Sequence, residues 1–184
     1  DLAFEYFQTR DEKLSTKVER KEEELNELDQ EITKYLTQLF REHLSTNEGE
    51  IGSSLLDLTR DIERIGDHAA GIVKDVNYQV KKNLNFSDDA QYEVSILSKI
   101  TKEMLSLTYE ALNENDKIKA IEALDYHHRI YEYEKKIRKK HIERMNEGIC
   151  QIKAGLYYVD IISHFTRICD HARNIVEKVI NNQS

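Results

Sequence analysis

The chain repeats itself at a fixed interval, and this repeat constrains the fold more than any other feature. When the sequence is shifted by 103 positions, residues 51–76 fall on residues 154–179 without a gap, with ten identities in 26 positions. The best-matched part is Arg64-Ile-Gly-Asp-His-Ala69 against Arg167-Ile-Cys-Asp-His-Ala172. An interval this long indicates a duplicated half of a domain rather than a solenoid of short repeats.

The composition predicts long helices and excludes two classes of partner. The 184 residues include no proline and only six glycines, the residue types that most disfavour a helix. The net charge of −8 argues against a nucleic-acid or anionic-membrane binder, since both need a basic surface. No apolar run approaches the roughly 20 residues that span a bilayer, so we expect no membrane insertion by this segment.

Apolar residues recur at heptad-like spacing over five segments. The predicted helices are Val18–Leu44, Ile51–Val80, Ser87–Leu112, Asp116–Arg144 and Ala154–Ile180. Spacing sustained over this length is typical of helices that pack side by side in bundles. Ser87 precedes two aspartates and is predicted to cap its helix. The predicted breaks at 47–50, 81–87, 113–115 and 146–148 are short, which makes neighbouring helices antiparallel.

The same offset predicts that most of one helix is missing from the first half. The image of Ser87–Leu112 would end near Thr9, so Asp1–Arg10 is expected to be the last turns of a truncated first helix. The predicted fold is all-α, with two repeated antiparallel three-helix bundles over residues 1–80 and 81–184. The truncation is expected to leave an apolar groove uncovered in the first bundle.

A stripe of polar residues runs beside the apolar face in both copies of the repeated helix. Its members are Asp57, Asp61, Arg64 and His68 in the first half and Asp160, His164, Arg167 and His171 in the second. We interpret the stripe as a structural network in which Arg64 pairs with Asp61 and His68, and a metal or anion site is the alternative. We expect the replacement of Arg64 by alanine to cost ~1–3 kcal/mol, because it leaves partly buried carboxylates unpaired.

A second pair of acids lies on the opposite face of the first repeated helix. Glu63 and Asp67 are four residues apart, so their carboxylates could share a divalent cation, and an ordinary solvated surface is the alternative. In the second half Asp170 keeps the second position, while Thr166 replaces the first. The sequence contains no His-Glu-x-x-His, no glycine-rich phosphate loop and no nucleophile elbow. We therefore expect that the protein is not an enzyme.

These motifs resemble the signature of a known family. Glu63-Arg-Ile-Gly-Asp67 and Arg167-Ile-Cys-Asp-His171 resemble the third and sixth helices of PhoU domains, whose fold is two three-helix repeats. The resemblance covers the whole chain except the missing part of the first helix, and it implies a non-catalytic regulator of phosphate uptake. The N-terminus and the acidic run from Lys21 to Leu36 most resemble PhoU domains fused to the cytosolic side of sodium–phosphate symporters.

The resemblance also implies metal binding through paired Glu/Asp-x-x-x-Asp motifs. The matching positions are Glu22-x-x-x-Asn26 with Glu63-x-x-x-Asp67, and Asp125-x-x-x-Arg129 with Thr166-x-x-x-Asp170. Only one of the four motifs is intact, and Arg129 places a positive charge where a ligand would lie. We expect iron, manganese or zinc to bind weakly at Glu22, Glu63 and Asp67, and little or not at all at Asp125 and Asp170.

Partners and location follow from the same resemblance. The expected partners are the membrane domain of a transporter or phosphate-signalling proteins, with homo-oligomers as a further possibility, on the cytosolic side of the cell membrane. Two cysteines cannot make a disulfide framework, which suits a reducing compartment. Two other classes stay open, a metal-sensing helical bundle and a purely structural oligomerisation module. Tight stoichiometric metal binding would favour the first, and failure to bind any ligand or partner the second.

Overall fold

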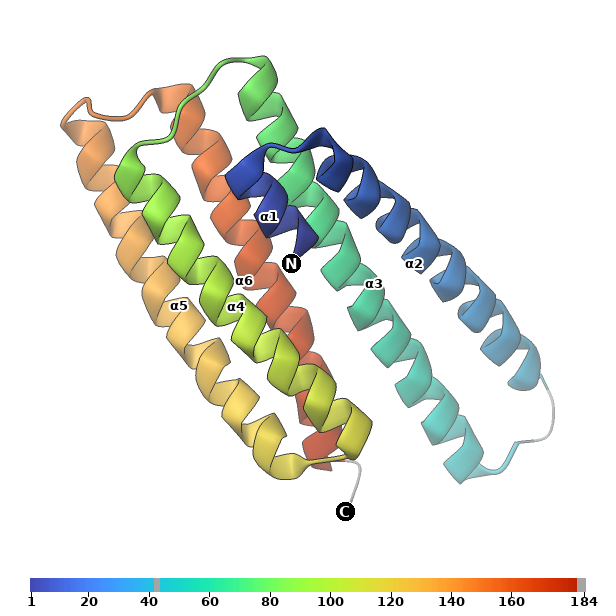
Figure 1. Ribbon diagram of the computed structural model, residues 1–184. Coiled ribbons are helices and arrows are strands. Elements are labelled where there is room, and N and C mark those ends of the chain that lie inside the picture. The colour runs from blue at the N-terminus through green and yellow to red at the C-terminus, as the bar shows by residue number, and fades with distance from the viewer. Residues whose placement is uncertain (42–43, 182–184) are drawn as a thin grey trace.

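A computed structural model describes residues 1–41 and 44–181 and contains six α-helices in these ranges (Figure 1). The helices are α1 (Leu2–Thr9), α2 (Glu12–Leu39), α3 (Thr46–Lys81), α4 (Asp88–Glu114), α5 (Lys117–Asn146) and α6 (Ile152–Asn181). The described residues contain no strand, so the all-α prediction is confirmed. No helix in these ranges is both long enough and apolar enough to cross a bilayer.

The helices form two three-helix groups that share one core. Helices α4, α5 and α6 each contact the other two, and α1, α2 and α3 do the same (Figure 1). Helices α3 and α6, which carry the two copies of the repeated segment, pack against each other and join the groups. Buried apolar side chains from both groups belong to a single cluster, with Val76 of α3 and Val176 of α6 fully buried in it. Helix α3 ends at Lys81, and the turn at 82–87 leads from it to α4.

Side-chain caps decide where the first long helices begin and end. The Ser45 hydroxyl accepts a hydrogen bond from the Glu48 backbone N–H at 3.3 Å, and the Glu48 carboxylate accepts one from the Ser45 N–H at 2.8 Å. This capping box starts α3, so the predicted break at 47–50 is wrong. Helix α2 begins after Asp11, earlier than predicted, and ends at Leu39. Residues 42–43, inside the predicted helix Val18–Leu44, lie outside the described residues.

The second half follows the sequence prediction more closely. Ser87 caps α4 as predicted, and its hydroxyl accepts a hydrogen bond from the Ala90 N–H at 3.3 Å. Asn115 ends α4 with a left-handed backbone at φ 53°, and the next residue, Asp116, caps α5. A two-residue connection of this kind makes α4 and α5 antiparallel neighbours.

Helix α1 covers only one end of the first bundle. It ends at Thr9, where the repeat offset predicts the end of the first helix, and Asp1 lies 3.3 Å from Lys102 of α4. The far ends of α2 and α3 project past α1 (Figure 1). Apolar side chains there are between 37% and 64% exposed: Leu28, Ile32, Tyr35 and Leu39 of α2, and Ile51, Leu55 and Ile62 of α3. We call this set the α2–α3 apolar surface, and its exposure agrees with the predicted uncovered groove.

Candidate functional site at the contact between the repeats

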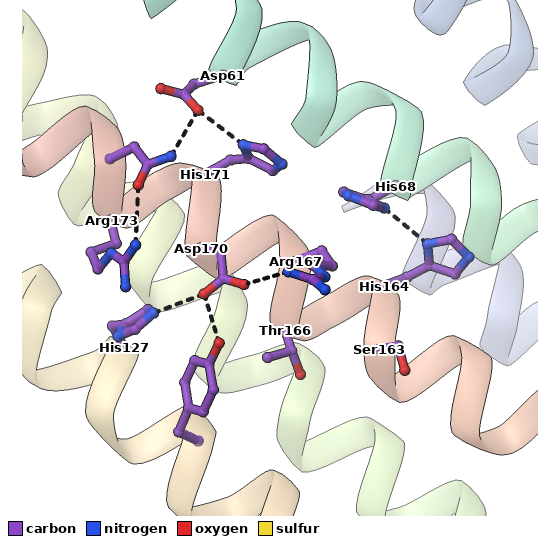
Figure 2. Close-up of polar contacts among 12 residues, drawn as sticks. Asp61, His68, His127, Ser163, His164, Thr166, Arg167, Asp170, His171 and Arg173 are labelled. Atoms are coloured by element: carbon purple, nitrogen blue, oxygen red, sulfur yellow. Dashed lines mark hydrogen bonds and ion pairs between the residues drawn. The ribbon is translucent and has the colours of Figure 1, made fainter.

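The two copies of the repeated motif meet where α3 packs on α6 (Figure 2). Because α3 and α6 are related by the repeat, a contact between them can recur with its partners exchanged. Asp61 of α3 accepts a hydrogen bond from Nδ1 of His171 on α6 at 2.9 Å. The exchanged contact joins His164 of α6 to His68 of α3, with their Nδ1 atoms 3.1 Å apart. One contact is therefore an acid–histidine pair, and its counterpart is a histidine–histidine pair.

The two contacts also differ in the residues that lie next to them. Asn174 donates its side-chain amide to Asp61 at 3.0 Å, and the repeat places Gly71 at the equivalent position of α3. A Cβ atom at Gly71 would lie 2.3 Å from Cε1 of His164, so the glycine leaves room for the His164 ring. Asp75 places Oδ2 3.3 Å from Nε2 of His164, but the geometry is not that of a hydrogen bond. That oxygen is buried and has no hydrogen-bond partner.

His68 lies in the middle of this cluster. Its ring stacks on that of His171, with the ring centroids 5.7 Å apart. Burial lowers the pKa of His68 to about 4, and the neighbouring His164 and His171 add to the effect. The His68 imidazole is therefore neutral at pH 7, with one ring nitrogen that donates a hydrogen bond and one that accepts.

The arginines of the predicted stripe do not join this cluster. Arg64 contacts Asp67 at 2.9 Å and Glu63 at 3.5 Å on its own helix, and its side chain is 53% exposed. Arg167 likewise lies 3.5 Å from Asp170 and is 67% exposed. The expected pairing of Arg64 with Asp61 and His68 is wrong, because Asp61 is occupied by partners from α6.

The remaining members of the stripe lie near its ends. Asp57 forms an ion pair with Lys178 of α6 at 3.1 Å, a partner that the single-helix argument missed. The repeat relates Lys178 to Asp75, so this contact also has no charge-equivalent counterpart. Asp160, the image of Asp57, is exposed.

The predicted metal ligands of the first half already contact other side chains. Glu22 accepts a hydrogen bond from the Asn26 amide at 2.6 Å. Glu63 and Asp67 do lie side by side, and burial together with the Asp67 charge raises the pKa of Glu63. Arg64 contacts both of these acids and offsets their charge. The two acids share a face, but it is not separate from the stripe as predicted, because Arg64 of the stripe contacts both of them.

In the second half the predicted ligands are arranged differently. Asp170 accepts hydrogen bonds from the Tyr131 hydroxyl at 2.8 Å and from His127 Nε2 at 3.2 Å (Figure 2). Asp125 is exposed, and the Arg129 guanidinium lies over the Tyr126 ring at 4.6 Å from its centroid. The aromatic and histidine side chains of α5 therefore serve here as partners of an acid on α6.

This arrangement does not fit a metal cluster. In the ranges 1–41 and 44–181, no group of three or more His, Cys, Asp or Glu side chains is placed to hold a metal ion. The carboxylates are instead hydrogen-bonded or paired with cations. Weak metal binding at Glu22, Glu63 and Asp67 stays a prediction.

A buried charge network in the second bundle escaped the sequence argument. Arg144 of α5 donates two hydrogen bonds to Glu93 of α4, at 2.9 and 2.6 Å. Tyr158 of α6 donates its hydroxyl to the same carboxylate at 2.5 Å, and all three side chains are buried. The image of Glu93 would fall before residue 1, so the repeat supplied no second copy that could have drawn attention to it.

Two three-helix bundles, joined through duplicated third helices that carry the same polar motif, define a class of duplicated helical-bundle proteins. The chain belongs to the PhoU domain family, whose profile matches residues 1–76 and 94–179. The resemblance found in the repeated motif is thereby confirmed.

Named relatives belong to the same family. The chain is 28% identical over 179 residues to the phosphate-specific transport system accessory protein PhoU homolog 1 of Thermotoga maritima, over 97% of this chain and 76% of that protein. It is 32% identical over 127 residues to the corresponding PhoU homolog of Streptococcus pneumoniae, over 69% of this chain and 57% of that protein. Both are named as accessory proteins, so they give no support to the symporter context expected from the sequence.

Solved structures share the fold. The phosphate transport system regulatory protein PhoU from Streptococcus pneumoniae superposes with a TM-score of 0.82 at 24% identity, over 97% of this chain and 83% of that one. PhoU from Pseudomonas aeruginosa gives a TM-score of 0.83 at 22% identity, over 92% of this chain and 81% of that one. At these identities the likeness shows the fold, and it confirms the predicted pair of three-helix repeats.

Proposed function

We propose that the chain is a non-catalytic regulator of phosphate transport that acts by contact with components of a phosphate transport system. The observation that carries this proposal is the PhoU match across both repeats, together with the accessory role in the relatives' names. The chain spans 57% of the Streptococcus relative and 76% of the Thermotoga relative, so the activity of those whole proteins is a proposal for this chain. We also propose that the chain lies on the cytosolic side of the cell membrane.

The α2–α3 apolar surface supports a function in binding. Exposed apolar patches on a protein surface commonly mark interaction sites, because water contact with them is unfavourable. Leu28 of α2 and Ile51 of α3 are each more than half exposed. A transport-system component and a second copy of the chain are the partners that we propose for this surface.

A deletion strain tests the proposal directly. We expect cells without this protein to keep taking up phosphate when phosphate is abundant, and we expect the unaltered protein to lower that uptake again. The double variant Leu28→Asp with Ile51→Asp should not lower it. Ile142→Asp is the matched control, since Ile142 is 60% exposed on α5, away from this surface. Unchanged uptake in the deletion strain would refute the proposed function.

The narrower hypothesis of a domain within a sodium–phosphate symporter needs a different observation. Several apolar segments of about 20 residues upstream of Asp1 would support it, because each could span a bilayer. An upstream sequence without such segments would leave the accessory-protein proposal as it stands.

A further inference from the structure

We infer that His68 and His164 form a binding site for a zinc-like divalent transition-metal ion between α3 and α6. The site is separate from the predicted carboxylate ligands, and it goes beyond the proposed function without depending on it. The two Nδ1 atoms are 3.1 Å apart. Two imidazole nitrogens at this separation can each lie about 2.0–2.1 Å from one zinc ion with an N–Zn–N angle of about 100°.

The proton positions on the two rings can accommodate the ion. The Nδ1 atoms lie at hydrogen-bond distance, so one of them carries the hydrogen in the metal-free protein. When both rings hold their hydrogen on Nε2 instead, both Nδ1 lone pairs are free, and a rotation of the rings turns them toward one point. This change moves a hydrogen from one nitrogen to the other within a ring, so it releases no net proton. The low pKa of His68 keeps that ring in the neutral form that metals bind.

Asp75 supplies the partner that the new tautomer needs. Its Oδ2 atom is buried, has no hydrogen-bond partner and lies 3.3 Å from Nε2 of His164. A hydrogen on Nε2, with a small ring rotation, satisfies this oxygen. Metal-binding histidines commonly donate their other N–H to a carboxylate, which fixes the ring and strengthens its basicity. The unsatisfied oxygen in the metal-free protein is therefore satisfied in the metal-bound one.

The neighbouring charges are compatible with a cation. Asp61 and Asp75 lie on either side of the cluster, and the nearby Arg167 side chain is directed to Asp170. His164 is 26% exposed, so an ion can reach it and water can fill the remaining coordination positions. A pair of histidines completed by water is consistent with the lack of a three-ligand group in the described ranges.

Two features suggest that the histidine pair is more than an accident of packing. The repeat places an aspartate, Asp61, at the position equivalent to His164, and Asn174 at the position equivalent to Gly71. Helix α3 therefore carries both His68 and Gly71, and this glycine leaves room for the ring of His164 on α6. An ion held there would bridge α3 to α6 and hold the two repeats together.

Zinc titration of the full, untagged chain tests the site. The protein is stripped with a chelator, and zinc binding is measured by competition with a chromophoric chelator. Apart from the weak binding predicted at Glu22, Glu63 and Asp67, we expect one zinc ion per chain, with a Kd raised more than about 100-fold in His68→Gln and in His164→Gln. Asp75→Asn should raise the Kd about 10-fold to 100-fold, the range seen when the carboxylate behind a metal-binding histidine is removed.

Gly71→Ala is the sharpest variant, because it keeps every histidine. Its methyl group must displace the His164 ring, while alanine favours the helix over glycine. We expect zinc binding to be lost and unfolding by urea to show an intact fold. Cobalt in place of zinc should give a visible absorption band that this variant lacks.

Two further variants serve as controls. His128→Gln removes an exposed histidine of α5 and should leave zinc affinity unchanged. Glu63→Gln alters the separate, weaker carboxylate site and therefore distinguishes binding at that site from binding at the histidine pair. Zinc binding that survives both His68→Gln and Gly71→Ala, that is lost in Glu63→Gln, or that is absent from the unaltered protein would overturn the proposal.

Discussion

Replacing Arg144 by methionine should remove about 3 kcal/mol from the free energy of unfolding. Arg144 and Glu93 form a bidentate pair in which neither residue is more than 7% exposed. Methionine keeps most of the side-chain volume, so the main loss is the charge that compensates the Glu93 carboxylate. Breaking one partner of a buried ion pair costs about 3–5 kcal/mol. Lys140 lies 3.9 Å from Glu93, which favours the lower end of that range.

Comparison of three variants separates charge from packing. Tyr158→Phe removes one hydrogen bond to the carboxylate, at 2.5 Å, and should cost about 1.5–3 kcal/mol. The double variant Glu93→Met with Arg144→Met buries no charge, so its cost should be well below that of Arg144→Met alone. A domain of ordinary stability, about 5–15 kcal/mol, would still fold with the single replacement.

Urea denaturation followed by circular dichroism measures these differences. The midpoint should fall while the m-value stays constant, because the surface exposed on unfolding is unchanged. A loss below about 1 kcal/mol for Arg144→Met would show that the Glu93 carboxylate is not shielded from water as the structure indicates. A double variant as unstable as the single one would place the cost in packing instead.

Three other measurements probe the remaining charged groups. The pKa of His68 is about 4 in the folded protein and 6.5 in the unfolded chain, so its contribution is complete above pH 6.5 and is lost as the pH falls toward 4. Urea titrations at pH 7 and pH 4.5 in chelator should therefore show a smaller loss for His68→Gln than for the unaltered protein. Arg64→Ala should cost less than about 1 kcal/mol by the same method, below the range expected from the sequence, because the side chain is mostly exposed. A cost of about 2 kcal/mol would contradict that exposure. Calorimetry with manganese should detect weak binding that Glu63→Gln with Asp67→Asn abolishes and that Thr166→Glu does not duplicate; equal binding to both halves would mean that other ligands are involved.

The fold was predictable because it depends on patterns that extend over many residues. Heptad spacing over tens of positions outweighs local irregularities, and the repeat fixed the order of the helices. The errors occurred at helix ends, where one or two hydrogen bonds decide the outcome. Ser45 and Glu48 start α3 through a capping box and carry Gly49 into the helix, although a glycine among polar residues favours a loop.

The polar site was predictable in its residues but not in its contacts. The repeat identified Asp61, His68, His164 and His171, because they are shared or exchanged between its copies. A wheel drawn for one helix assigns partners along that helix, whereas Asp61 and His171 meet across two helices. Glu93 had no image in the repeat and no neighbouring motif, so only the packed structure could reveal it.

The interface between α3 and α6 contains two equivalent contacts that can be compared within one molecule. One backbone setting occurs twice, once around an aspartate with its amide neighbour and once around a histidine with its glycine. Exchanging Asp61 and His164 would transpose these two side chains, while their neighbours Asn174 and Gly71 stay in place, without altering composition or net charge. Any property that moves with the exchange belongs to the side chains, and any that stays in place belongs to the surrounding helices. The duplication therefore provides, within one chain, two matched contacts in which the effect of the side chains can be separated from the effect of the helices.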